Sequence, residues 1–151
     1  MVSDPSTKYL RVLSPLEDGV AAFSEAAPIN FVMIARVHGA LELEELRDGV
    51  SQLQRRHPLL RTRMVLHGVE EVRLTDLDVP EIPIRVVEIP DEYWTDEAER
   101  EVNEPFDYET GPLIRVSWLR HSDLDHRLLV TFHHSIGDGR SGVFLIRDLL
   151  R

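Results

Sequence analysis

The sequence predicts an α/β or α+β domain, with a mixed sheet flanked by helices. Two β-rich stretches, residues 59–89 and 112–134, carry short apolar or alternating runs typical of strands. Other segments repeat apolar residues every three or four positions, as one face of a helix does. Strands and helices mixed along the chain in this way argue against a helical bundle or a β-sandwich.

The composition limits the classes of protein to which the chain can belong. The chain has 151 residues, 42% of them hydrophobic, which suits one domain with one core. It has 27 acidic and 17 basic residues and a net charge of -10, which disfavours nucleic-acid binding. The one dense basic stretch, residues 55–63, is broken by Pro58 and lacks interleaved aromatics.

The chain contains no cysteine, which excludes disulfide scaffolds, thiolate zinc sites and cysteine nucleophiles. Residues 1–9 hold no apolar run typical of a secretory signal, and no stretch of 18 apolar residues predicts a transmembrane segment. We therefore expect a cytoplasmic protein.

In the first third of the chain, residues 15–24 predict a short helix with Ser14 as its N-cap. Residues 30–37 form a mostly apolar run and predict a buried strand. Residues 41–56 place apolar side chains at three- and four-residue intervals, so we expect an amphipathic helix that Pro58 ends.

The remaining elements follow from the same patterns. They are a β-hairpin of residues 59–66 and 69–74, a strand at 84–89, an acidic helix at 94–103, strands at 112–120 and 127–134 joined by a polar turn at 121–126, and a helix at 139–151. The last helix is apolar over much more than one stripe, so we expect it to be buried on most sides.

Two adjacent histidines, His133 and His134, end the last predicted strand. Leu128, Val130 and Phe132 alternate with Leu129 and Thr131, and successive side chains of a strand point to opposite faces. The two histidines therefore emerge on different sides. They cannot easily share one ligand. We expect one of them to be structural and the other functional.

A short turn with two glycines, residues 135–139, follows the histidines and leads into the last helix. Glycines let a strand end, a carboxylate and a helix start come close together, and a neutral imidazole at such a corner is a good general base. The residues alone leave a plainer alternative open, in which His134 is a satisfied polar residue and Asp138 only stabilises the turn. A metal site at this pair lacks a third ligand.

The run HHSIGDG, residues 133–139, resembles the HHxxxDG signature of condensation domains of nonribosomal peptide synthetases, polyketide-associated acyltransferases and wax ester synthases. RHPLLRTRM at 56–64 resembles the RHxxLRT segment of these proteins, and PFDYETGPLIRVSWLR at 105–120 resembles their PFDLxxGPLLR segment. Residues 65–104 match no motif. The resemblance implies the two-layer sandwich of chloramphenicol acetyltransferase.

In that family the signature lies near the end of the first of two similar halves, with the active-site channel between them. The resemblance therefore implies that residues 1–151 form an N-terminal subdomain, and that the C-terminal subdomain is absent from this chain. We expect this part alone to be inactive and to associate with itself or with a second chain.

The resemblance also implies roles for individual residues. His134 would be the general base that takes a proton from an acceptor hydroxyl or amine, and His133 would orient the strand end. Asp138 would point away from the reacting atoms and form an ion pair with Arg61. Gly139 would leave room for the substrate, and its N–H would help to stabilise an oxyanion.

The implied function is acyl transfer from a coenzyme A or phosphopantetheinyl carrier-protein thioester to an alcohol or amine. No tightly bound cofactor or metal is expected, because the thioester is already activated. We favour a free-standing ester-forming enzyme, because Met1 begins the chain with no carrier domain before it. The alternatives are an amide-forming condensation domain, working with an acyl carrier protein, and a non-catalytic binding or assembly domain.

Overall fold

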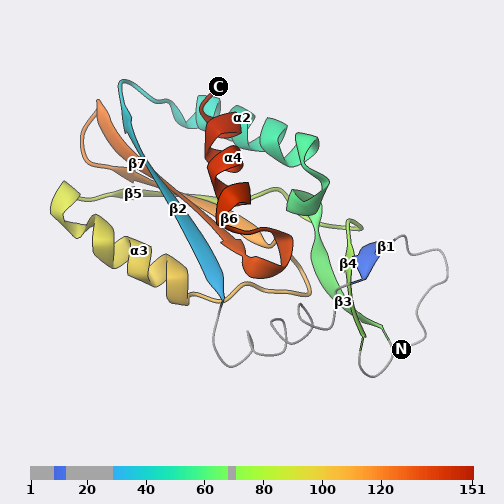
Figure 1. The fold of residues 1–151 in the computed structure, drawn as a ribbon. Helices are drawn as coiled ribbons and strands as arrows, with labels where there is room; N and C mark the ends of the chain where they lie inside the picture. Colours follow the sequence, from blue (N-terminus) through green and yellow to red (C-terminus); the bar gives the residue numbers. More distant parts are fainter. Residues whose placement is uncertain (1–8, 13–28, 68–70) are drawn as a thin grey trace.

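The structure, a computed structural model, describes residues 9–12, 29–67 and 71–151. The helix predicted at 15–24 lies outside them. The elements are the strands β1 (Tyr9–Val12), β2 (Asn30–His38), β3 (Arg63–His67), β4 (Glu71–Thr75), β5 (Ile84–Glu88), β6 (Ile114–Arg120) and β7 (Asp125–His133), the α-helices α2 (Leu43–Arg56), α3 (Trp94–Asn103) and α4 (Gly139–Leu149), and the 3₁₀-helices η1 (Pro58–Arg61), η2 (Asp91–Tyr93) and η3 (His134–Ile136) (Figure 1).

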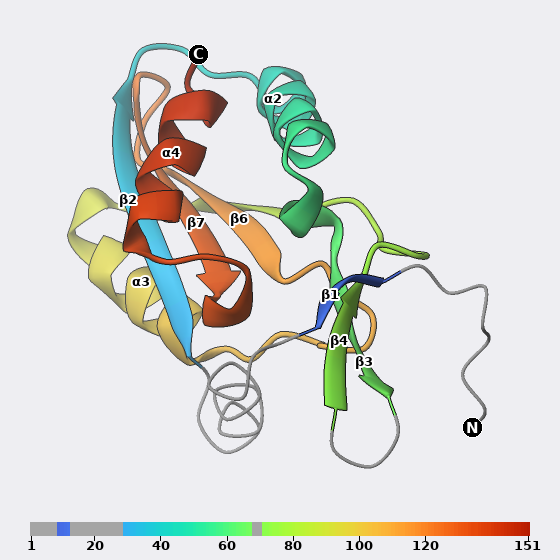
Figure 2. The ribbon, with the colours of Figure 1, turned by 45° about the vertical axis from the view of Figure 1, so that its right-hand side comes forward.

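A four-stranded sheet in the order β2-β7-β6-β5 forms the centre of the fold. β5 runs parallel to β6, and the other two pairs are antiparallel. The strands β1, β4 and β3 make a second, antiparallel sheet beside it (Figure 2). This mixed sheet and its flanking helices confirm the predicted fold class.

Helices cover both faces of the larger sheet. α2 and α4 lie on one face and α3 on the other (Figures 1 and 2). The alternation along β7 explains this layering, because Leu128, Val130 and Phe132 join the core cluster with Leu53 of α2 and Leu145 of α4. The intervening side chains of β7 are also buried, on the face that α3 covers.

Gly142 lets α4 approach the sheet closely. A Cβ atom added there would overlap the side chain of Met33 on β2 and would lie 3.0 Å from Cε1 of Phe132 on β7. Any larger residue must therefore displace the Met33 side chain or push the helix away from the sheet. The close approach holds the first turn of α4, which begins at Gly139, the last residue of the HHSIGDG run.

Three predictions need correction. β2 is an edge strand rather than a buried one, and Ile34 is 40% exposed. α4 is covered on one side only, with Val143 57% and Phe144 47% exposed. Residues 59–61, predicted as strand, belong to the 3₁₀-helix η1, because Pro58 favours the first turn of a helix. The other elements predicted within the described residues are confirmed within a few residues.

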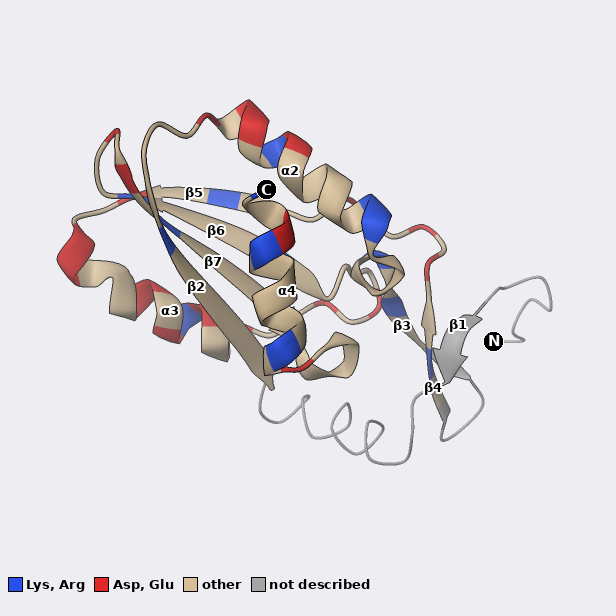
Figure 3. Cartoon of the chain, turned by 45° about the horizontal axis from the view of Figure 1, so that its top comes forward, with Lys and Arg blue, Asp and Glu red and all other residues tan. Residues whose placement is uncertain are grey.

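Charged residues occur on the helices, on the strands and in the loops (Figure 3). Red acidic positions follow α2 and α3, and α4 carries both signs. None of the described helices is long and apolar enough to cross a membrane.

Candidate active site

Backbone hydrogen bonds fix the end of β7 on both sides. The N–H of His133 donates to the carbonyl oxygen of Leu113 over 2.9 Å, and the N–H of His134 donates to that of Ile29 over 3.1 Å. The two histidines then separate, as the alternation predicts. His133 is fully buried, whereas His134 is exposed.

The imidazole of His134 is held in one tautomer by the turn that follows it. Its Nδ1 lies 3.2 Å from the carbonyl oxygen of Gly137. A carbonyl oxygen only accepts hydrogen bonds, so Nδ1 carries a proton, and in the neutral ring Nε2 is the nitrogen with the lone pair. The Phe31 ring contacts the imidazole edge on, at 5.1 Å between centroids, and itself stacks on Phe132. The ring is therefore oriented, with a free basic nitrogen.

His133 has the opposite environment. Its Nδ1 accepts a hydrogen bond from the N–H of Ser135 over 3.2 Å and lies 2.8 Å from that residue's hydroxyl oxygen. Tyr108 packs edge on against its ring. Burial, together with the neighbouring His134, lowers the pKa of His133 to about 4. His133 is thus neutral near pH 7 and holds the turn by hydrogen bonding and packing.

Asp138 caps the first turn of α4. Its Oδ1 accepts hydrogen bonds from the backbone N–H and the hydroxyl of Ser141, each 2.9 Å long. The backbone bond and the hydroxyl bond both hold the pKa of Asp138 below its usual value. The carboxylate therefore stabilises the helix start that follows the histidines.

The structure does not form the ion pair that the resemblance implies for Asp138 and Arg61. No ion pair joins these two side chains within the part of the chain that the structure describes. Arg61 lies at the end of η1, not on the same strand as Arg63, and its Nε is buried without a hydrogen-bond partner. The first-turn groups of α4 hold the carboxylate instead.

The glycines of the turn differ in what surrounds them. A Cβ atom on Gly139 would meet nothing within 4 Å, so the space beside it is open. One on Gly137 would lie 3.0 Å from Cβ of Ser141 and 3.3 Å from Phe132. The turn is therefore packed at Gly137 and open at Gly139.

The three segments that carry the resemblance meet in space. The N–H of Met64 donates to the carbonyl oxygen of Tyr108 over 2.7 Å, and Tyr108 in turn contacts His133. Gly111 has a φ of 63°, and a Cβ atom there would lie 2.7 Å from the carbonyl oxygen of Thr62. Residues 105–111 thus link the 56–64 segment to the histidine turn.

Sequence reasoning missed a buried carboxylate on the opposite face of the sheet. Glu101 of α3 is 1% exposed and accepts four side-chain hydrogen bonds, from Arg115 Nε (2.5 Å), Ser117 Oγ (2.5 Å), Thr131 Oγ1 (3.0 Å) and Arg85 Nη2 (3.2 Å). We call these five residues the Glu101 cluster. Arginines inside otherwise apolar strands are the signal that predicts such a buried partner.

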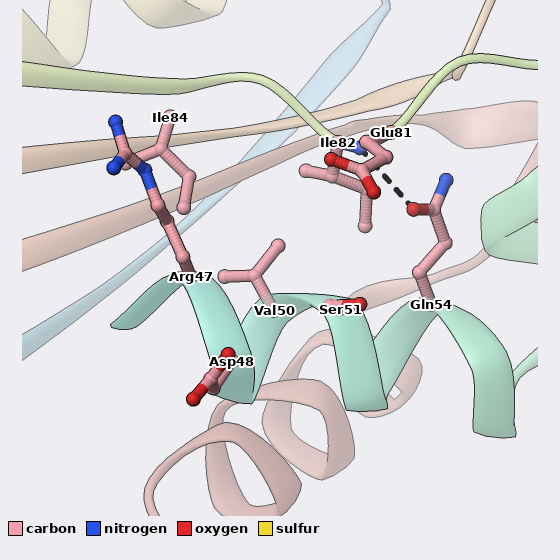
Figure 4. Close-up of a pocket in the computed structure, with 8 residues that line it drawn as sticks. All are labelled: Arg47, Asp48, Val50, Ser51, Gln54, Glu81, Ile82 and Ile84. Atoms are coloured by element: carbon pink, nitrogen blue, oxygen red, sulfur yellow. Dashed lines mark hydrogen bonds between the residues drawn. The ribbon is translucent and has the colours of Figure 1, made fainter. Parts of the chain in front are cut away.

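One cavity, of about 320 Å³, opens between α2 and the segment that leads into β5 (Figure 4). The amide of Gln54 closes one side, where its Oε1 accepts from the N–H of Ile82 over 3.3 Å. Arg47, Asp48 and Glu81 give it a charged lining. It contains none of the predicted site residues.

A second cavity, of about 360 Å³, adjoins the turn after the histidines. Ile136 and Ser141 line it together with Phe144 of α4. At its edge Nε2 of His57 lies 3.1 Å from Oδ2 of Asp148, which joins the end of α2 to α4. The cavity is therefore partly apolar, and His134 is not among the residues that line it. Across residues 9–12, 29–67 and 71–151, no group of three or more His, Asp or Glu side chains could hold a metal ion.

The fold defines a class. A mixed sheet flanked by helices in this way is the arrangement of the chloramphenicol acetyltransferase-like fold. The starter condensation domain of rhizomide synthetase has this fold, and its solved structure matches with a TM-score of 0.81 at 16% identity, over 95% of this chain and 36% of that one.

Sequence comparison gives the family. The family model of the Condensation domain matches residues 22–151. The chain is 36% identical to surfactin synthase subunit 1 of Bacillus subtilis (strain 168), over 98% of this chain and 4% of that protein. It is 34% identical to phosphinothricin tripeptide synthetase PhsC of Streptomyces viridochromogenes, over 91% of this chain and 13% of that protein. The chain belongs to the condensation-domain family, and it spans a small part of these relatives.

Proposed function

We propose that this chain forms part of a condensation domain that joins two carrier-protein-bound substrates through an amide bond, with His134 as the proton acceptor. One observation carries the proposal. The hydrogen bond from His134 Nδ1 to the carbonyl oxygen of Gly137 selects the neutral tautomer in which Nε2 holds the lone pair, and the side chain is exposed. This neutral tautomer is the form of His134 that would act as a general base.

The proposed reaction balances without a cofactor. The acceptor amine attacks the carbonyl carbon of the donor thioester, and a C–N bond forms while the amine proton passes to Nε2 of His134. The C–S bond then breaks, and the leaving thiolate receives the proton back from the imidazolium. The products are an amide and a free thiol, and the histidine returns to its starting tautomer.

The relatives favour an amide over the ester-forming, free-standing enzyme that sequence analysis favoured. One relative at 34% identity is a tripeptide synthetase by name, and its product therefore contains amide bonds. In an amide-forming domain of this kind, the acyl donor would be a phosphopantetheinyl thioester on a carrier protein rather than a coenzyme A thioester. Ester formation becomes the alternative that the experiment must exclude.

The other predicted residues have supporting roles in this proposal. Buried, neutral His133 holds the strand end, and Asp138 holds the start of α4. Open space beside Gly139 leaves room for the reacting carbonyl group. We also propose that a second subdomain completes the channel, because the chain spans only 36% of the solved rhizomide condensation domain.

The test uses the complete protein that carries this chain. An acyl donor is supplied either on a carrier protein or on coenzyme A, with an acceptor carrier loaded with an amine or with its hydroxy analogue. Mass spectrometry of the acceptor carrier detects the product. We expect amide product with the carrier-bound donor. Preferred ester product, or preferred coenzyme A donor, would contradict the proposal, and binding without any turnover would favour a binding or assembly domain.

A further inference from the structure

The Glu101 cluster ties α3 to three neighbouring strands at one point. Arg85 comes from β5, Arg115 and Ser117 come from β6, and Thr131 comes from β7. All four side chains donate to the one carboxylate of Glu101. The positions of these strands are therefore coupled to a single group.

The carboxylate of Glu101 is ionised although it is buried. Burial raises its pKa, but the hydrogen bonds from Arg115 and Ser117, with the charge of Arg115, hold the pKa below its usual value. A buried ion pair of this kind is often no more stabilising than apolar side chains of similar volume. A gain in stability is therefore not a sufficient reason for this buried ion pair. We consider instead how the cluster fixes the relative positions of the strands.

Thr131 connects the cluster to the candidate base. It is fully buried on β7, three residues before His134, and its Oγ1 donates to Oε2 of Glu101 over 3.0 Å. Its side chain is on the face of the strand opposite to Phe132, whose ring stacks against Phe31 behind the imidazole. The last residues of β7 are thus held from both faces of the sheet.

The end of α3 adds a second connection to the same place. Nδ2 of Asn30 donates to the carbonyl oxygens of Glu101 and Glu104, over 3.3 and 2.8 Å. Asn30 lies directly opposite His133 in the pairing of β2 with β7. Helix α3 therefore contacts both β2 and β7, the strands that hold the backbone around His134.

We propose that Thr131, through its hydrogen bond to Glu101, is a positioning residue for His134. The bond fixes how far β7 extends toward the turn, and so keeps Nδ1 of His134 within reach of the Gly137 carbonyl oxygen. The proposal rests on the proposed function for its kinetic consequence, because only a catalytic His134 makes its position matter for the rate.

A matched pair of substitutions separates positioning from stability. Thr131→Val removes the hydroxyl and keeps the branched shape. Ser117→Ala removes another hydroxyl from the same carboxylate, but from β6, the neighbouring strand, which does not carry the histidines. In the complete protein we expect Thr131→Val to lower kcat on the order of 10-fold to 100-fold with little change in KM, as a small misplacement of a catalytic group does. Ser117→Ala should stay within about twofold on the same scale.

Thr131→Ser keeps a hydroxyl donor at this position, so its kcat should stay near the wild-type value. Thr131→Ala is measured in parallel, so that the conclusion does not depend on the folding of one variant. Equal loss of kcat in Ser117→Ala and in the Thr131 variants, or wild-type kcat in Thr131→Val, would overturn the positioning role.

A spectroscopic measurement is independent of turnover. With ¹⁵N-labelled histidine, the ring nitrogen shifts of His134 report which nitrogen carries the proton. We expect the Nδ1–H tautomer in the wild type and in Ser117→Ala, and a mixture of tautomers in Thr131→Val. An unchanged tautomer in Thr131→Val would contradict the proposal. A changed tautomer, together with full turnover by His134→Ala, would instead contradict only the proposed function.

Discussion

His134 donates through Nδ1 to the carbonyl oxygen of Gly137 over 3.2 Å, and this contact determines which ring nitrogen is basic. Its neighbour His133 has the opposite arrangement, since its Nδ1 accepts from the N–H of Ser135 and its ring is buried. Two adjacent histidines are therefore given different tautomers by the backbone of one short turn. The structure thereby distinguishes a candidate base from a structural residue.

Burial of His133 predicts a specific dependence of stability on pH. Its folded-state pKa is about 4, below the value of 6.5 for an unperturbed histidine, so the unfolded chain binds a proton first as the pH falls. Stability should decline between about pH 6.5 and pH 4, by up to roughly 3 kcal/mol from this group. Chemical denaturation of the complete protein across this range measures the effect.

The control for this prediction is His133→Asn, which retains a side chain able to accept a hydrogen bond but does not titrate. Its stability should be lower near pH 7 and should change less between pH 6.5 and pH 4. An equally steep decline in both proteins would show that other groups cause the loss of stability.

The capping role of Asp138 predicts a moderate and local loss. Asp138→Ala should lower the free energy of unfolding by about 1 kcal/mol, as removal of an N-cap does, whereas Asp138→Asn should lose less. Because no ion pair joins Asp138 to Arg61, a double-mutant cycle with Arg61→Ala should give additive losses. A coupling energy above about 1 kcal/mol would instead show that Asp138 and Arg61 interact, as the family resemblance implies.

Two glycines of α4 provide a matched test of the packing that positions the turn. Gly142→Ala forces a Cβ atom into Met33 and should cost about 1–3 kcal/mol. Gly139→Ala meets no atom within 4 Å and should leave stability nearly unchanged. Thermal or chemical unfolding compares the two variants. Similar losses in both would mean that α4 is not held against the sheet at Gly142.

Elements whose signal is local could be predicted from the sequence. The helix α2, the hairpin β3–β4 and the strand β7 follow from periodicity and turn residues, which act within a few positions. The separation of His133 from His134 also follows from the alternation of one strand. The tautomer of His134 could not be predicted from this alternation. It depends on the Gly137 carbonyl oxygen, which the geometry of the turn brings to Nδ1.

Features that depend on distant segments could not be predicted in the same way. The acidic pattern of α3 gives no sign that Glu101 is buried, since its partners Arg115 and Thr131 come from later strands. Likewise, the apolar pattern of α4 cannot show that Phe144 stays 47% exposed, because exposure depends on what packs there. Asp138 was assigned a partner by resemblance, and local capping by Ser141 proved to hold it instead.

The central claim is that His134 accepts the proton during amide formation, and a single-turnover measurement of His134→Ala in the complete protein tests it most directly. Donor and acceptor carriers are both preloaded, so that loading and product release do not limit the observed rate. We predict a rate about 10²–10⁴-fold below that of the wild type, with donor carrier binding and folding unchanged. Formation of the amide at close to the wild-type rate would contradict the account.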